Sequence, residues 1–146
     1  MEELFSARGI DPARVQARLE KAAGEVGLPF GKRGKTYNSR LAQELGKWAE
    51  EEGRGDAFHM AMFKAYFVDG INLADIDLLV ELAESIPLNG VAARRILEER
   101  VYQHAVDRDW QRAHALGITA VPTFLANGRR LVGAQTYEAL EMLIQD

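Results

Sequence analysis

The sequence predicts a mainly α-helical protein with a single β-hairpin near its end. Apolar residues recur at helical spacing through most of the chain, and glycine or proline interrupts each run. Near the end, Pro122 precedes a short apolar segment at 123–126, which leads directly into Asn127-Gly128. Asn-Gly between two apolar runs is a strong signal for a two-residue hairpin turn, so residues 129–132 are expected to form the return strand.

Capping residues mark the predicted helices. Asp11-Pro12 begins the first helix and Gly27 ends it, while Asn38 or Ser39 begins the second. A third helix, at about 56–68, carries large apolar side chains, and we expect it to lie at the centre of the core. These side chains are Phe58, Met60, Met62, Phe63, Tyr66 and Phe67. Further helices are expected at about 75–85, 91–100, 102–116 and 136–145.

Composition excludes several classes of function. The 146 residues carry a formal net charge of −4 and no cysteine. An acidic chain is not expected to bind nucleic acid, and the lack of a long apolar run predicts no membrane partner. Without cysteine there is no thiolate catalysis, and the three histidines show no metal-ligand spacing, so no cofactor and no metal site are predicted. The first residues have no signal-peptide pattern, so we expect a cytoplasmic location.

The predicted hairpin leaves one strand edge without a partner. A two-stranded sheet is marginal in water, and the sequence offers no further convincing strand beside 123–126. An open edge is a template for another strand. One hypothesis is therefore a binding or assembly module that forms a homodimer through the edge Thr123 to Ala126.

Four segments carry a resemblance to a known family. They are Tyr37-Asn38-Ser39, the run from Met62 to Phe67 before Asp69-Gly70, the run from Ala115 to Phe124, and Gly133-Ala134-Gln135. In this order they resemble the DsbA-like thioredoxin superfamily, and within it the FrnE-like branch of predicted dithiol–disulfide oxidoreductases. The 2-hydroxychromene-2-carboxylate isomerases and kappa-class glutathione transferases are related families.

The resemblance implies a helical insertion joined to the C-terminal half of a DsbA-like thioredoxin fold. Residues 1–101 would form the insertion, or lid, and residues 102–146 the thioredoxin-fold remnant. Met1 to Phe5 look like the start of the insertion, so the family's preceding strand, Cys-x-x-Cys helix and second strand are absent from this sequence. We therefore expect a truncated chain or a natural remnant that has no thiol–disulfide activity alone.

The resemblance also implies a substrate-binding site and no catalytic residue. Pro122 matches the family's cis-proline, and Val121 matches the residue whose backbone pairs with the substrate backbone. Thr119 and Ala120 would line the rim of the same binding site. The substrates would be proteins or small thiols and disulfides. Asn38 matches a position near the groove, although a helix cap explains an asparagine there without any ligand and is the favoured interpretation. Gln135, beside Thr136, matches the glutathione-binding position of the related transferases, so a glutathione-dependent isomerase or transferase is a further alternative.

Overall fold

The computed structural model describes residues 11–32 and 34–145. By their internal contacts the residues form two compact units, Met1–Val106 and Asp107–Asp146. The sequence-based assignment of Met1 to Phe5 lies outside the described residues. In the part of the chain that is described, no helix combines the length and the apolar character needed to span a membrane.

The first described helix of the first unit begins and ends where its capping residues predict. It is α2, Pro12–Glu25, and the Asp11 carboxylate accepts a hydrogen bond from the Ala13 N–H at 2.9 Å. Gly27, just beyond the helix, has a φ of +70°, a conformation that glycine adopts without steric cost. The following loop is tied to α2 because the Gln16 amide donates to the Gly31 carbonyl at 3.0 Å.

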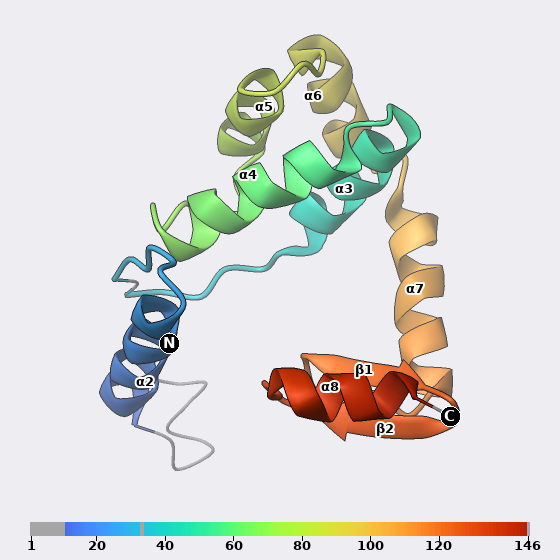
Figure 1. Ribbon diagram of the computed structural model, residues 1–146. Helices are drawn as coiled ribbons and strands as arrows, with labels where there is room; N and C mark the ends of the chain where they lie inside the picture. The colour runs from blue at the N-terminus through green and yellow to red at the C-terminus, as the bar shows by residue number, and fades with distance from the viewer. Residues whose placement is uncertain (1–10, 33, 146) are drawn as a thin grey trace. The chain divides into compact units, whose positions relative to one another are not determined.

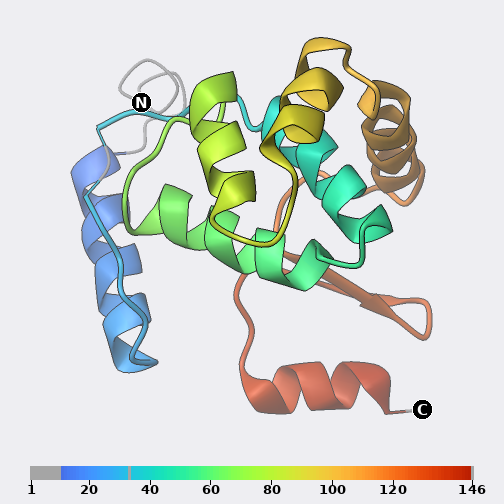
Figure 2. The same cartoon turned by 90° about the horizontal axis from the view of Figure 1, so that it is seen from above.

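Four helices of the first unit surround its hydrophobic core (Figures 1 and 2). They are α3, Arg40–Glu51; α4, Gly55–Phe67; α5, Ile76–Glu84; and α6, Gly90–Glu98. Each begins within two residues of its predicted start, and α4, α5 and α6 also end within two residues of their predicted ends. The core consists of Ala42, Leu45, Trp48, Ala49, Phe58, Leu73, Leu79, Val80, Ala83, Ala93, Ile96 and Leu97.

Helix α4 does not lie at the centre of this core, so that expectation was wrong. Phe58 is fully buried, but Met60 and Phe63 are 68% and 52% exposed. The helix is apolar around most of its circumference, and only one side can face α3 and α5. The apolar positions of α3, α5 and α6 supply most of the buried side chains instead.

A buried carboxylate joins α3 to the end of α6. The side chain of Glu44 is completely buried, and it accepts hydrogen bonds from Arg40 Nε at 2.9 Å and from Arg100 Nε and Nη2 at 2.8 and 2.7 Å. Hydrogen bonding to Arg100 is the main reason that the pKa of Glu44 lies below its ordinary value, even though burial opposes this shift.

Arg100 also occupies an unusual place in the backbone. The Val101 N–H bonds to the Ile96 carbonyl and the Arg100 N–H to the Leu97 carbonyl, which is the Schellman arrangement that ends α6. Glycine is usual at the position of Arg100 because the residue is left-handed, here with a φ of +54°. The contact with Glu44 gives a physical reason for arginine at this position.

The second unit contains the predicted hairpin and a covering helix. Helix α7, Gln103–Ala115, leads into strands β1, Thr123–Ala126, and β2, Arg129–Val132, and then α8, Tyr137–Ile144. The strands are antiparallel, with Ala126 opposite Arg129 and Thr123 opposite Val132. Asn127 and Gly128 have φ of +51° and +71°, as a type I′ turn requires. The predicted fold class, mainly helical with one hairpin, is therefore confirmed.

Helix α8 covers one face of the hairpin (Figure 1). The Arg129 guanidinium donates to the carbonyls of Leu143 and Gln145, so α8 lies on the face that Arg129 shares with Leu131 and Phe124. Leu125 and Val132 lie on the opposite face and are 44% and 52% exposed. The hairpin therefore keeps one apolar face open within the second unit.

Candidate functional site

The segment between α7 and β1 forms an exposed rim. Gly117 ends α7 with a φ of +68°, and the Ile118 N–H donates to the Ala113 carbonyl at 2.9 Å. Thr119 and Ala120 are exposed, and Val121 is 88% exposed. The peptide bond between Val121 and Pro122 is cis. Four of the predicted site residues, Thr119 to Pro122, thus form one continuous accessible stretch of backbone.

Hydrogen bonds anchor this rim at its junction with β1. The Thr123 hydroxyl donates to the Ala120 carbonyl at 2.6 Å, which closes the rim onto the strand. The Pro122 carbonyl accepts from the Gly133 N–H at 2.8 Å. This bond extends the pairing of β1 and β2 by one residue pair. At this position another residue would direct its N–H toward β2, but proline has no N–H to donate.

The outer edge of β1 follows from this register. In a two-residue hairpin the closing pair, Ala126 and Arg129, is hydrogen-bonded, and bonded pairs alternate with non-bonded pairs along the ladder. Thr123 and Leu125 therefore occupy non-bonded positions, and their N–H and C=O groups point away from β2. Within residues 11–32 and 34–145, none of these four backbone groups has a hydrogen-bond partner.

The outer edge of β2 differs because a side chain covers part of it. Gln135 Nε2 donates to the Val132 carbonyl at 2.8 Å, which satisfies one of the acceptors that point away from β1. Arg130 donates from Nη1 to the Gly117 carbonyl at 2.8 Å. Gln135 thus has a local structural partner, a contact that the sequence did not predict, and its predicted role toward a ligand stays a prediction.

Two further candidate residues make local hydrogen bonds where helices begin. The Asn38 side chain accepts from the Arg40 N–H at 2.9 Å just before α3, in the first unit. The Thr136 hydroxyl accepts from the Ala139 N–H at 3.3 Å and begins α8. The pKa of Glu138 lies below its ordinary value because the Glu138 carboxylate accepts a hydrogen bond from its own backbone N–H and, less strongly, from the Thr136 side chain. Thr136 is therefore the N-cap of α8, whereas Asn38 lies one residue before the N-cap of α3, and a ligand-binding role for Asn38 stays a prediction.

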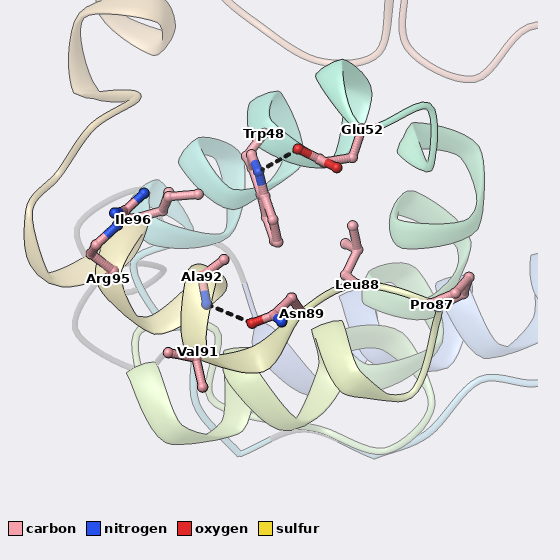
Figure 3. Close-up of a pocket in the computed structure, with 9 residues that line it drawn as sticks. All are labelled: Trp48, Glu52, Pro87, Leu88, Asn89, Val91, Ala92, Arg95 and Ile96. Carbon is pink, nitrogen blue, oxygen red and sulfur yellow. Dashed lines mark hydrogen bonds between the residues drawn. The ribbon is translucent and has the colours of Figure 1, made fainter.

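The first unit contains a groove that the sequence did not reveal (Figure 3). It has a volume of about 840 Å³ and lies between α3, α6 and the segment that joins α5 to α6. The Trp48 indole forms an inner wall and donates to Glu52 at 3.2 Å. Asn89 caps α6 by accepting from the Ala92 N–H at 2.9 Å. The residues that line it are Trp48, Glu52, Pro87, Leu88, Asn89, Val91, Ala92, Arg95 and Ile96.

Apolar side chains line most of this groove, together with one carboxylate, Glu52, and one guanidinium, Arg95, and its lining includes no serine, threonine, cysteine or histidine. Trp48 belongs to the hydrophobic core of the first unit, and its side chain is only 6% exposed. The contribution of Arg95 depends on how α6 packs against α3, which no local sequence pattern specifies. Among the described residues, no group of three or more histidine and acidic side chains is placed to hold a metal ion.

The hairpin with its preceding proline and covering helix defines the class of fold: the C-terminal part of a thioredoxin-like domain. Comparison with protein families supports the same class, since residues 5–145 match the model of the DSBA-like thioredoxin domain. The chain therefore belongs to the DSBA-like thioredoxin domain family.

A curated bacterial relative agrees with this assignment. The chain is 32% identical over 133 residues to YwbO of Bacillus subtilis (strain 168), which is itself described as an uncharacterized protein. The match covers 90% of this chain and 66% of the relative, so the chain spans just under two thirds of the relative's length.

Proposed function

We propose that this chain is the substrate-binding part of a thiol–disulfide exchange protein of the FrnE-like branch. Its role is to bind an extended polypeptide along the rim Thr119 to Val121, while the thiol chemistry is performed by sulfur atoms outside this sequence. The observation that carries the proposal is the combination of the family match over residues 5–145 with an exposed Val121-Pro122 rim in a chain without cysteine.

The separation of substrate binding from thiol chemistry follows from the mechanism of thiol–disulfide exchange. A thiolate attacks one sulfur of a disulfide, a mixed disulfide forms, and the other sulfur leaves as a thiolate. None of the residues of this sequence can provide that thiolate. Val121 can instead offer its backbone N–H and C=O to an extended substrate, because the residue is 88% exposed and lies at the start of the sheet.

Peptide binding to a matched pair of variants tests the proposed rim. The ligand is an unfolded, alkylated protein fragment without free thiols, and binding is measured by calorimetry. Val121→Ala keeps the backbone N–H and is expected to bind as the wild type does, whereas Val121→Pro removes the donor and is expected to bind more weakly. Equal affinity of both variants, with unchanged circular dichroism, would contradict backbone recognition at Val121.

A reductase assay tests the absence of thiol chemistry in this chain. Insulin reduction by glutathione is followed with and without the protein, and we expect the two rates to be equal. Acceleration of the reaction by purified, cysteine-free chain would overturn this part of the proposal.

We assign the protein to the cytoplasm, where thiols are kept reduced and a chain without disulfides is at no disadvantage.

A second candidate function is that of a binding module that acts through the edge of β1. The observation in its favour is the set of four backbone groups of Thr123 and Leu125 that point away from β2. Strand addition at such an edge supplies affinity through main-chain hydrogen bonds. Its test is amide hydrogen exchange, because a bound strand is expected to slow exchange at Thr123 and Leu125 and to leave Arg130 on β2 unchanged.

A further inference from the structure

Side chains at the turn of the hairpin cap the C-terminal end of α8. The Asn127 side-chain amide donates from Nδ2 to the Ile144 carbonyl at 3.2 Å. The Arg129 guanidinium donates from Nη2 to the carbonyls of Leu143 and Gln145. The last carbonyls of a helix have no partner within the helix, so these bonds satisfy acceptors that the helix itself leaves open. An uncharged amide and a cation therefore hold the end of α8.

Asn127 is also one of two asparagines in this sequence that directly precede a glycine, and the other is Asn89. Asparagine is a chemically labile residue. A following glycine makes it more so, because glycine has no Cβ to keep its peptide nitrogen away from the asparagine side chain. The two dipeptides share this intrinsic chemistry, so their surroundings determine which of them reacts in the folded chain.

The two glycines have different surroundings. Gly90 is buried and is the first residue of α6, with Asn89 as the N-cap, and a Cβ at Gly90 would lie 2.0 Å from a carboxylate oxygen of Glu84. Gly128 is exposed, and a Cβ there would meet nothing within 4 Å. In the described part of the chain the Gly128 N–H has no hydrogen-bond partner. Its nitrogen can therefore move toward the Asn127 side chain without displacing a packed group.

We propose that Asn127 is a site of spontaneous deamidation and that the reaction releases the end of α8. The Gly128 nitrogen loses its proton to solvent hydroxide and attacks Cγ of Asn127. A C–N bond forms, and Nδ2 takes up a proton from water and leaves as ammonia. A second water molecule opens the resulting succinimide ring. Hydrolysis of the new bond gives aspartate, and hydrolysis of the original peptide bond gives isoaspartate, whose main chain runs through Cβ and Cγ.

Both products remove the donor that the Ile144 carbonyl uses. Aspartate also places a carboxylate at the C-terminal end of a helix, where the partial negative charge of the backbone disfavours an anion. The carboxylate attracts the Arg129 guanidinium, which the carbonyls of Leu143 and Gln145 then lose. Isoaspartate lengthens the main chain of a two-residue turn, and the turn determines which residues of β1 and β2 face each other. The last turn of α8 therefore loses its side-chain partners.

Peptide mapping by mass spectrometry tests the site. The 146-residue chain is incubated in mildly alkaline buffer, folded or unfolded in urea. In the folded chain we expect Asn127 to react at least about tenfold faster than Asn89, because opening the start of a packed helix costs more than opening an exposed turn. In urea we expect similar rates. Equal rates in the folded chain would overturn the proposal, and so would a folded chain that reacts at neither site while the unfolded chain reacts at both.

Two variants test the release of α8 by amide hydrogen exchange at Ile144 and Gln145. Asn127→Asp reproduces the aspartate product and keeps a residue that type I′ turns favour, whereas Asn127→Gly removes the donor without adding charge. We expect exchange about tenfold faster than in the wild type for Asn127→Asp and a smaller increase for Asn127→Gly. Wild-type exchange in Asn127→Asp would overturn the release of α8. Faster exchange in Asn127→Gly than in Asn127→Asp would overturn the role of the carboxylate.

Discussion

Replacing Arg100 by glycine tests whether the buried Glu44 carboxylate determines the packing of the first unit. The change removes two of the three hydrogen bonds that Glu44 accepts and leaves only the bond from Arg40. It leaves the left-handed backbone at position 100 intact, because glycine adopts a φ near +54° without steric cost. The substitution therefore removes the guanidinium group without forcing the backbone out of its conformation.

The expected magnitude is the difference between two effects. Removing one partner of a buried ion pair costs about 3–5 kcal/mol of stability when the remaining charge has no other partner, and the lower end of that range applies here because Arg40 still pairs with Glu44. Relief of the left-handed backbone at Arg100 returns about 1 kcal/mol. Arg100→Gly is therefore expected to lose about 2 kcal/mol in the free energy of unfolding. Arg100→Lys, which keeps the charge but not the paired donors, is expected to lose less.

Urea unfolding followed by circular dichroism measures these losses, and pH supplies a second test. The pKa of Glu44 is lower in the folded chain than its ordinary value of 4.5, so its stabilising contribution is complete above that pH and disappears as the pH falls through the folded pKa. The stability difference between wild type and Glu44→Gln should therefore shrink on acidification. Arg100→Gly with wild-type stability, or a difference that grows in acid, would refute the reasoning.

Three further predictions concern single contacts of the first unit. Asp75→Ala removes the carboxylate that caps α5 and is expected to cost about 1 kcal/mol in urea unfolding. Burial, and then the hydrogen bond to Glu51 at 2.5 Å, raise the pKa of Tyr102 to about 12. The free energy of unfolding should therefore fall as the pH rises from 10 toward 12. Tyr102→Phe should remove this decline in unfolding curves measured at alkaline pH. Gly31→Ala would place a Cβ 1.9 Å from the Val68 carbonyl oxygen, so a lower melting temperature is expected, and an unchanged one would contradict this packing.

Local signals in the sequence predicted most of the secondary structure. Asp11-Pro12 and Asn127-Gly128 act through hydrogen bonds and backbone conformations within a few residues, so their effects can be recognised without tertiary information. The interior of the first unit was harder to predict. Helix α4 is apolar on both sides, and periodicity alone could not show that Met60 and Phe63 face outward.

The contacts that sequence reasoning missed join residues that are distant in the sequence. Glu44 and Arg100 are 56 residues apart, and neither lies in a recognisable motif. Arginine at the end of α6 gave no sign of a left-handed residue, because glycine is the usual signal for that conformation. The rim at Thr119 to Pro122 was predicted from the resemblance of the run Ala115 to Phe124 to a known family, whereas the contact of Gln135 with β2 depends on the turn that follows Val132.

Residue-resolved amide exchange during titration with an unfolded, alkylated protein tests the central claim most directly. We predict slower amide exchange within the segment from Thr119 to Leu125 and no change at the amide of Trp48 in the α3–α6 groove. Unchanged exchange throughout that segment, with protection confined to the groove, would contradict the assignment of the Val121-Pro122 rim and the β1 edge as the binding surface of this chain.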